Sequence, residues 1–250
     1  MSDKADSSLA RMLSVLDMFT DQQLQWSAED ICAALKVSLA TGYRYTKTLT
    51  DAGLLQRCSD SRYTLGPRII VLDHYIRQAD PVLKVGMPFI KELALQTGFD
   101  CVVSALYGGQ LLDTHRELGA VPAPLSYGRG RPRPLFLGGA PKAILSNLSS
   151  TQLRKMFDHH QSDILAAGLP TDWPEFRRYY AAIRKAGYYF SNGELEPNLA
   201  ALAAPLLHPD GSVIGAISLV TTVQRMAVVD SQKLAPLVMR AAQDISSRLL

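Results

Sequence analysis

Cysteine is scarce in this 250-residue chain: there are three, an odd number, and they are widely spaced. Such a set provides neither a disulfide framework nor a metal-ligand pattern, so we expect no metal and we interpret Cys32, Cys58 and Cys101 as small, mostly buried hydrophobic side chains. No run of about 18 apolar residues occurs, which argues against a membrane-spanning helix. The first ten residues, MSDKADSSLA, lack the apolar stretch of a signal peptide, which favours the cytoplasm.

The signatures of the common enzyme classes are also missing. The sequence contains no P-loop, no GxSxG elbow and no dinucleotide-binding fingerprint. None of the five histidines stands at ligand spacing from a cysteine or a carboxylate. We therefore expect no catalytic residues and no cofactor. Gly138-Gly139 precedes a helical run and could present backbone amides to an anion, but a tight strand-to-helix connection explains the pair equally well.

Charge is modest and unevenly distributed. The chain is 47% hydrophobic and 20% charged, which is typical of a globular protein with one large or two ordinary domains. The formal net charge of +3 is too small to indicate a polyanionic partner. Residues 1–80 carry net charge −1 and residues 81–250 carry +4. A nucleic-acid reader near the N-terminus would therefore depend on a local basic patch.

The first 66 residues have the pattern of a winged helix-turn-helix. Residues 9–19 show helical spacing of apolar side chains, Ser27 can cap a second helix, and Ser38 can cap a third that Gly53 ends. Two short strand-like runs follow at 54–58 and 62–66, joined by turn residues. In this arrangement the third helix enters the major groove and the hairpin lies near the phosphates.

The outward face of the third helix carries the candidate DNA contacts. Residues 36–68 hold six basic side chains against two acidic ones, a local charge of +4. Arg44 is the best candidate for reading a base edge, most naturally guanine. The full set of candidate DNA-binding residues is Ala40, Thr41, Tyr43, Arg44, Lys47, Arg57 and Arg62. Thr41 and Tyr43 could contact a base or a phosphate, and the basic residues other than Arg44 suit phosphates. An ordinary solvated helix remains the alternative, and Gly42 in the middle of it invites close packing or easy deformation.

The remainder alternates between helical and extended patterns. Residues 69–80 form a helical connector before the break at Asp80-Pro81, and an amphipathic helix then ends at Gly98. Residues 101–117 are typical of a hairpin around Gly108-Gly109. The later elements predicted from the sequence are helices starting near Ser149 and Thr171, strands over 201–207 and 213–221, and a closing helix over 230–250.

Four blocks in order resemble the IclR family of bacterial transcriptional regulators. They are YTLGPR at 63–68, PLFLGGAPKA at 134–143, GYYFSNGELEPNLAALAAPL at 187–206 and DGSVIGAISL at 210–219. The resemblance implies an α+β protein of three parts. These are a winged helix-turn-helix DNA-binding domain over 1–66, a linker helix over 67–80, and a GAF-like (profilin-like) α/β effector-binding domain over 81–250.

The resemblance also implies partners. It points to double-stranded, palindromic operator DNA, to a small organic-acid effector from a catabolic pathway, and to a homodimer or dimer of dimers. Two alternatives belong to other classes. One is a ligand-binding module that keeps a vestigial helix-turn-helix for dimerisation, and the other is an enzyme that turns the ligand over.

The effector pocket departs from the family pattern. Family members that bind small, very polar acids typically use an Asp and a Cys, and the aligned positions here are Ser191 and Ala201. Phe136 and Gly138 replace the usual His and Thr/Ser. These changes make the cavity less polar and favour an aromatic or other fairly apolar organic acid. The candidate effector-binding residues are Phe136, Leu137, Gly138, Gly139, Ser191, Leu199, Ala201, Leu202 and Arg129, with Leu125 and Tyr127 as weaker candidates. Core packing explains each of them at least as well.

The stretch YGRGRPRP at 127–134 resembles an AT-hook, which places arginines in the minor groove. Apolar segments flank it on both sides, and it runs directly into the PLFLGGAPKA block, so DNA contact is the least favoured of three interpretations. The others are a solvated strand edge with surface arginines and a rim of the pocket where Arg129 or a neighbour pairs with an effector carboxylate.

Overall fold

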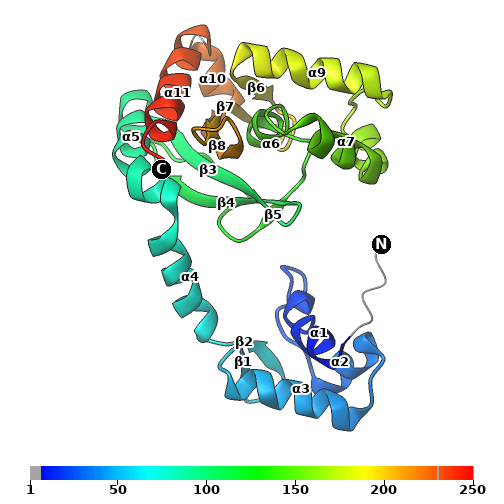
Figure 1. The fold of residues 1–250 in the computed structure, drawn as a ribbon. Helices are drawn as coiled ribbons and strands as arrows, with labels where there is room; N and C mark the ends of the chain where they lie inside the picture. The colour runs from blue at the N-terminus through cyan, green and yellow to red at the C-terminus, as the bar shows by residue number, and fades with distance from the viewer. Residues whose placement is uncertain (1–6, 230, 250) are drawn as a thin grey trace. The chain divides into compact units, whose positions relative to one another are not determined.

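A computed structural model describes residues 7–229 and 231–249. The chain divides between Ala79 and Asp80 into two compact units, which are described separately here (Figure 1). The N-terminal unit is helical with one small hairpin, and the C-terminal unit is built on a six-stranded sheet. The α+β fold class expected from the sequence is confirmed.

The N-terminal unit is a helix-turn-helix followed by a two-stranded wing. Its core contains Val15, Ile31, Tyr45, Leu49 and Leu55. Its elements are α1 (Ser8–Leu13), the 3-10 turn η1 (Leu16–Met18), α2 (Ala28–Leu35), α3 (Leu39–Asp51), β1 (Leu55–Arg57), β2 (Tyr63–Leu65) and α4 (Arg68–Ala79). The two strands pair antiparallel, with Gln56 opposite Thr64.

The first helix is shorter than its apolar spacing predicts. The prediction ran from residue 9 to residue 19, whereas α1 ends at Leu13 and only a 3-10 turn follows. The Ser14 hydroxyl donates to the Arg11 carbonyl at 2.9 Å, which competes with continued helix. The break lets Val15 become fully buried while Leu9 and Leu13 stay exposed. Packing, and not periodicity, sets the end of this helix.

The C-terminal unit has one sheet with the strand order β5-β4-β3-β8-β7-β6, and every neighbouring pair is antiparallel. The strands are β3 (Asp100–Tyr107), β4 (Gln110–Glu117), β5 (Pro132–Arg133), β6 (Tyr189–Asn192), β7 (Leu199–Leu207) and β8 (Val213–Thr222). The predicted hairpin and the last two strands are present, whereas β6 was not anticipated. Ser191, Ala201 and Val220 lie side by side across β6, β7 and β8.

Helices cover the two faces of this sheet differently. Leu202 and Leu219 point into the core beneath α5 and α11, whereas Ala203 and Ala216 face α6. Because side chains alternate along a strand, the α6 face is also the face of Ala201. The helices are α5 (Pro81–Thr97), α6 (Gly139–Leu145), α7 (Ser150–His159), α8 (Gln161–Ala166), α9 (Trp173–Ala186), α10 (Val223–Val228) and α11 (Ser231–Ser246). Figure 1 shows α5 and α11 together on one side of the sheet and α7 and α9 beyond α6.

Most predicted helix ends agree with the structure. Gly98 and Gly187 end α5 and α9 in the left-handed conformation, and Ser149 caps α7 with a capping box. The helix predicted to start at Thr171 begins instead at Trp173, because the Asp172 carboxylate caps it. Residues 230 and 250 of the predicted closing helix lie outside the described residues.

Candidate functional site

Helix α3 presents one buried and one exposed face. The Ser38 hydroxyl accepts from the Thr41 amide and so starts the helix at Leu39. The side chains predicted to face inward, together with Gly42, are buried: Tyr45, Thr46 and Leu49. The same 3.6-residue period leaves the opposite face free for a ligand.

The exposed face of α3 carries most of the candidate DNA contacts. Ala40, Tyr43, Arg44 and Lys47 are exposed, and neither basic side chain forms an ion pair with any residue the structure describes. Thr41 is half-buried, with its hydroxyl 3.0 Å from that of Ser38. Arg44 is thus an exposed guanidinium in the middle of this face, and its contact is with the Tyr45 ring, whose centre lies 6.0 Å from the guanidinium carbon.

Tyr43 is tethered to the preceding helix. Its hydroxyl donates to Glu29 Oε1 at 2.6 Å, across the turn between α2 and α3. This hydrogen bond lowers the pKa of Glu29 and raises the pKa of Tyr43 above its ordinary value. The tether orients the ring and leaves a carboxylate beside it, so Tyr43 is better placed for a base edge than for a phosphate.

The wing places two arginines on its exposed surface. Arg57 Nη2 donates to the Ser61 hydroxyl at 3.1 Å, and Arg62 Nε lies 3.6 Å from Asp60 Oδ2. Ser61 adopts a left-handed backbone, with φ of 66°, which closes the tight turn. Asp60 offsets part of the charge of Arg62, whereas the hydrogen bond of Arg57 to the neutral Ser61 hydroxyl leaves its charge undiminished.

Gly42 permits the close contact between α2 and α3. A Cβ at this position would lie 2.0 Å from the Sγ of Cys32, which is itself buried. Helix propensity alone would favour alanine by about 1 kcal/mol. Overpacking of a core costs about 1–3 kcal/mol and outweighs that gain, so the glycine serves packing and not flexibility.

We therefore expect Gly42→Ala to lower the free energy of unfolding of the N-terminal unit by about 1–2 kcal/mol. Each unit holds one of the two tryptophans, so denaturation of a Trp173→Phe background, followed by Trp26 fluorescence, reports on this unit. Cys32→Ala in the same chain should recover most of the loss, because it removes the clashing sulfur. Equal deficits with and without Cys32 would contradict this explanation.

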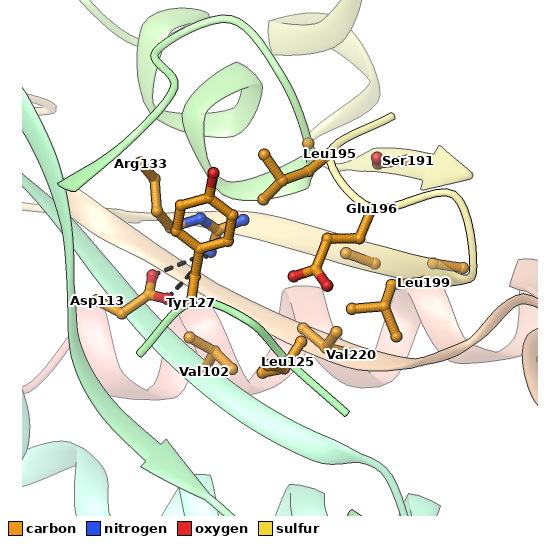
Figure 2. A pocket seen from close by; sticks show the side chains of 13 residues that line it. Val102, Asp113, Leu125, Tyr127, Arg133, Ser191, Leu195, Glu196, Leu199 and Val220 are labelled. Carbon is orange, nitrogen blue, oxygen red and sulfur yellow. Dashed lines mark hydrogen bonds and ion pairs between the residues drawn. The ribbon is translucent and has the colours of Figure 1, made fainter. Parts of the chain in front are cut away.

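A small cavity lies on the α6 face of the sheet (Figure 2). Its volume is about 30 Å³, room for one or two waters, whereas a cavity that binds benzene needs about 150 Å³. It is lined by Val102, Asp113, Leu125, Tyr127, Arg133, Gly138, Ser191, Leu195, Glu196, Leu199, Ala200, Ala201 and Val220. An aromatic molecule can enter only if a wall moves.

The segment 118–131 forms one wall of the cavity and contributes Leu125 and Tyr127. A latch joins it to the segment 193–198: Glu196 accepts from the Ser126 amide at 3.1 Å and from its hydroxyl at 2.9 Å. At its start, the same segment is anchored by buried Asp100, which accepts from the Gly119 and Ala123 amides. The segment is therefore anchored near its start by Asp100 and near its end by Arg129, which donates to the Thr114 carbonyl, and it is held near its middle by the exposed latch.

One ion pair lies in the cavity wall. Arg133 Nη1 donates to both carboxylate oxygens of Asp113, at 3.0 and 3.2 Å, as the dashed lines in Figure 2 mark. Asp113 also accepts from the Ser104 hydroxyl at 2.7 Å, and the guanidinium carbon of Arg133 lies 5.9 Å from the centre of the Tyr127 ring. The pair supplies the polar end of an otherwise largely apolar cavity.

A second polar network ties α6 to the loop after β6. Lys142 Nζ donates to Glu194 Oε2 at 2.5 Å and to the Tyr189 hydroxyl at 3.0 Å, and that hydroxyl donates to Glu194 Oε1. Burial is the main cause that raises the pKa of Tyr189, followed by its bonds to Tyr179 and Glu194. Glu194 also accepts from the Gly138 amide at 3.2 Å. The amide considered for anion binding is thus already committed to a carboxylate of the same chain.

The structure brings together only part of the predicted effector set. Gly138, Ser191, Leu199 and Ala201 line the cavity, as do the weaker candidates Leu125 and Tyr127. Leu202 lies on the opposite face of β7, in the core beneath α5 and α11.

Four other candidates also lie away from the cavity lining: Phe136, Leu137, Gly139 and Arg129. Phe136 is 1% exposed and packs against Phe176, and it borders a separate groove together with Leu137. Gly139 is the first residue of α6 and faces the methyl group of Ala203 on β7. The Phe136 side chain, which the sequence suggested as an effector contact, is therefore buried in the aromatic interior formed by α7, α8 and α9.

Several lining residues were missed by the reasoning from sequence. Ala200, Val102 and Val220 carried a usable signal, because they belong to strands beside the predicted site. Asp113 and Glu196 carried none, because their place depends on strand pairing and on loop paths. Arg133 is a neighbour of Arg129 in the stretch that the sequence offered as a possible pocket rim, and it lines the cavity. The missed lining residues are Val102, Asp113, Leu195, Glu196, Ala200 and Val220.

The three arginines of YGRGRPRP have different surroundings. Arg129 donates to the Thr114 carbonyl, and Arg131 donates to the Ser126 carbonyl and lies over the Tyr127 ring. Arg133 belongs to β5 and lines the cavity. The stretch is part of the folded sheet edge and cavity wall, unlike the extended, flexible chain of an AT-hook.

Residues 7–229 and 231–249 contain neither a candidate metal site nor a candidate membrane span. No group of three His, Cys, Asp or Glu side chains there could hold a metal ion. None of the helices in this part of the chain is both long and apolar enough to cross a bilayer.

Comparison with known proteins identifies the two units. Residues 8–58 match the IclR helix-turn-helix domain, and residues 74–247 match the bacterial transcriptional regulator IclR C-terminal family. The transcriptional regulator XynR of Escherichia coli is 24% identical over 91% of this chain and 90% of its own length. The p-hydroxybenzoate hydroxylase transcriptional activator of Acinetobacter baylyi is 23% identical over 88% and 83%.

A solved structure shares the fold. An IclR homologue from Microbacterium hydrocarbonoxydans, complexed with 4-hydroxybenzoate, superposes with a TM-score of 0.77 at 20% identity and covers 97% of this chain and 99% of its own. The two family matches together span most of the sequence, in the order of the two units seen in the structure. The chain belongs to the IclR family of bacterial transcriptional regulators, with a helix-turn-helix for DNA and an effector-binding domain.

Proposed function

We propose that this regulator reads a palindromic double-stranded operator with α3 in the major groove. The exposed guanidinium of Arg44, which forms no ion pair with any described residue, is the observation that carries the proposal. Arg44 reads guanine through a bidentate pair, and Thr41 and Tyr43 contact neighbouring base edges or sugar. Lys47, Arg57 and Arg62 hold the register through phosphates, and Ala40 packs against the groove wall.

A homodimer, alone or paired into a dimer of dimers, presents two such helices. Helix α4 supports this, because none of its twelve residues is buried within the described chain. Ile70, Tyr75 and Ile76 are 74%, 62% and 61% exposed, which is unusual for large apolar side chains along one helix. A second copy of α4 would cover them and would fix the spacing of the two half-sites.

The effector is an aromatic or other fairly apolar organic acid bound in the cavity of Figure 2. Val102, Leu125, Leu199 and Val220 give it apolar walls, and Ser191 and Ala201 offer little to a very small polar acid. The relatives named for p-hydroxybenzoate hydroxylase activation and for a 4-hydroxybenzoate complex support the same class. Opening of the segment 118–131 supplies the missing volume.

A thermal-shift series on the full chain tests the effector class. 4-Hydroxybenzoate should raise the unfolding temperature in a concentration-dependent way, because a ligand that binds only the folded state stabilises it by mass action. Glyoxylate, a small polar acid, should produce no comparable shift. Stabilisation by glyoxylate and by no aromatic acid would overturn the proposed class.

The latch between Ser126 and Glu196 should control the rate of binding. Ser126→Ala removes one hydrogen bond to a carboxylate at an exposed site, worth about 1 kcal/mol, and should speed association of 4-hydroxybenzoate by about fivefold. Stopped-flow mixing measures this rate. Ser212→Ala is the matched control, since that hydroxyl also donates to a carboxylate but in an exposed turn away from the cavity lining. Equal rates in the two variants would refute a gating role.

Effector binding can alter operator affinity only through unequal affinity for the DNA-competent and the other arrangements. Helix α4 connects the wing to the effector domain, so it is the element through which such a difference would act. Measuring operator affinity with and without 4-hydroxybenzoate gives the coupling directly, and equal affinities would exclude it as an effector of regulation.

A further inference from the structure

The guanidinium of Arg133 has one engaged side and one empty side. Its Nη1 donates to both oxygens of Asp113, whereas its buried Nε has no hydrogen-bond partner among residues 7–229 and 231–249. The side chain is only 11% exposed, so water does not freely solvate the empty side. Buried donors are nearly always hydrogen-bonded, so the unsatisfied Nε indicates that an acceptor from outside the described chain binds there.

The empty side has the geometry of a carboxylate receptor. Nε and Nη2 project in parallel from one edge of the planar group, and this two-pronged fork matches the two oxygens of a carboxylate. Nη1, which Asp113 holds, lies at the far end of the group. Occupation of Nη1 therefore leaves the fork intact.

Gly138 lies beside that fork without a side chain. A Cβ there would already be in van der Waals contact, 3.4 Å from Nη2 of Arg133 and 3.7 Å from the Leu195 Cβ. The backbone there, with φ of 93°, also favours glycine. The absence of a side chain at residue 138 therefore keeps the approach to the fork unobstructed, and the proposed opening of the segment 118–131 supplies the room for a carboxylate.

The neighbours of Arg133 fix its orientation. Asp113 is 4% exposed and is itself held by the Ser104 hydroxyl, and the Tyr127 ring stands beside the guanidinium in Figure 2. Of the three arginines in this stretch, Arg133 is the one in the cavity lining. It is a preorganised group and not a mobile surface charge.

We propose that the Nε–Nη2 edge of Arg133 receives the carboxylate of the effector and sets the preference of the site for aromatic monocarboxylates. The inference rests on the proposed function, namely that this cavity takes an aromatic acid. Asp113 and Glu196 already place two carboxylates in the lining, with Arg133 as the sole lysine or arginine among those residues. A second ligand carboxylate would meet like charge, so dicarboxylates are disfavoured.

Calorimetric titration of the full chain tests the inference with two probes of nearly the same shape, 4-hydroxybenzoate and 4-hydroxybenzamide. Wild type should prefer the acid. Arg133→Lys keeps the charge but loses the fork, and should weaken binding of the acid by about 10- to 100-fold while changing binding of the amide little. Arg178→Lys, a variant on the exposed surface of α9 outside the cavity lining, should leave the acid's affinity unchanged.

Asp113→Asn should change the affinity for 4-hydroxybenzoate in the opposite direction to Arg133→Lys. It removes the charge that competes for Arg133, so the acid should bind several-fold more tightly and the amide should not. Equal affinity for acid and amide in wild type, or a loss in Arg178→Lys as large as that in Arg133→Lys, would overturn the role of Arg133 while leaving the aromatic effector intact. Failure of wild type to bind either probe would instead overturn the proposed effector class, and this inference with it.

Discussion

Replacing Asp100 with asparagine is expected to destabilise the effector domain by about 3 kcal/mol. Asp100 is fully buried in β3, where it accepts from Arg116 Nε and Nη2 at 3.1 and 2.5 Å and from the amides of Gly119 and Ala123. An amide in its place has the same size, but its NH₂ group would face donors and would leave Arg116 unpaired. Breaking a buried ion pair costs about 3–5 kcal/mol, and the 26% exposure of Arg116 favours the lower end because water can partly solvate it.

Denaturation in a Trp26→Phe background measures this effect, because Trp173 then reports on the effector domain alone. Asp158→Asn is the control, since Asp158 is 46% exposed and pairs with Arg154 on a helix surface, where such pairs contribute about 0.5 kcal/mol. A loss for Asp100→Asn no larger than for Asp158→Asn would show that the carboxylate is not the anchor of the segment 118–131. The cavity wall formed by that segment would then need another support.

The DNA-binding unit was largely predictable because its determinants are local. Ser27 and Ser38 cap the helices at the predicted places, and the 3.6-residue period assigns Tyr45 and Leu49 to the core. Gly42 was ambiguous in the sequence, because its partner Cys32 is on another helix. Where a determinant is non-local, as in the burial of Val15 that shortens α1, the sequence pattern misleads.

The effector cavity was predictable only in part because it is assembled across strands. Ser191, Ala201 and Val220 become neighbours through the register of three antiparallel strands, which no local pattern encodes. Successive side chains of a strand point to opposite faces of the sheet, so Leu202 points away from the cavity that its neighbour Ala201 lines. The approach of β5 to β4, which puts Arg133 against Asp113, depends on a long irregular connection.

Arg44→Ala is expected to reduce affinity for the operator by at least about 30-fold. A bidentate pair to a base contributes about 1–3 kcal/mol of discrimination, and a dimer loses it at both half-sites, about 2–6 kcal/mol in total. Arg44 is exposed and makes no ion pair within the described chain, so its removal should leave the free energy of unfolding unchanged. The operator is obtained by selection from random DNA with the wild-type chain, and affinity is then measured by retardation at fixed salt.

Lys47→Ala separates reading from electrostatic attraction. Lys47 lies one turn along the same exposed face. If Lys47 contacts a phosphate, Lys47→Ala should weaken binding to selected and to random DNA equally, and should reduce the salt dependence of binding by about one ion per half-site. Arg44→Ala should instead weaken binding to selected DNA far more than binding to random DNA. Arg44→Lys should not restore the preference for selected DNA, because an ammonium group lacks the two-pronged fork of a guanidinium. If operator binding survives Arg44→Ala while dimerisation is intact, α3 is not the reading helix. The alternative of a ligand-binding module with a vestigial helix-turn-helix then gains support, because the exposed face of α3 would carry charge without sequence information.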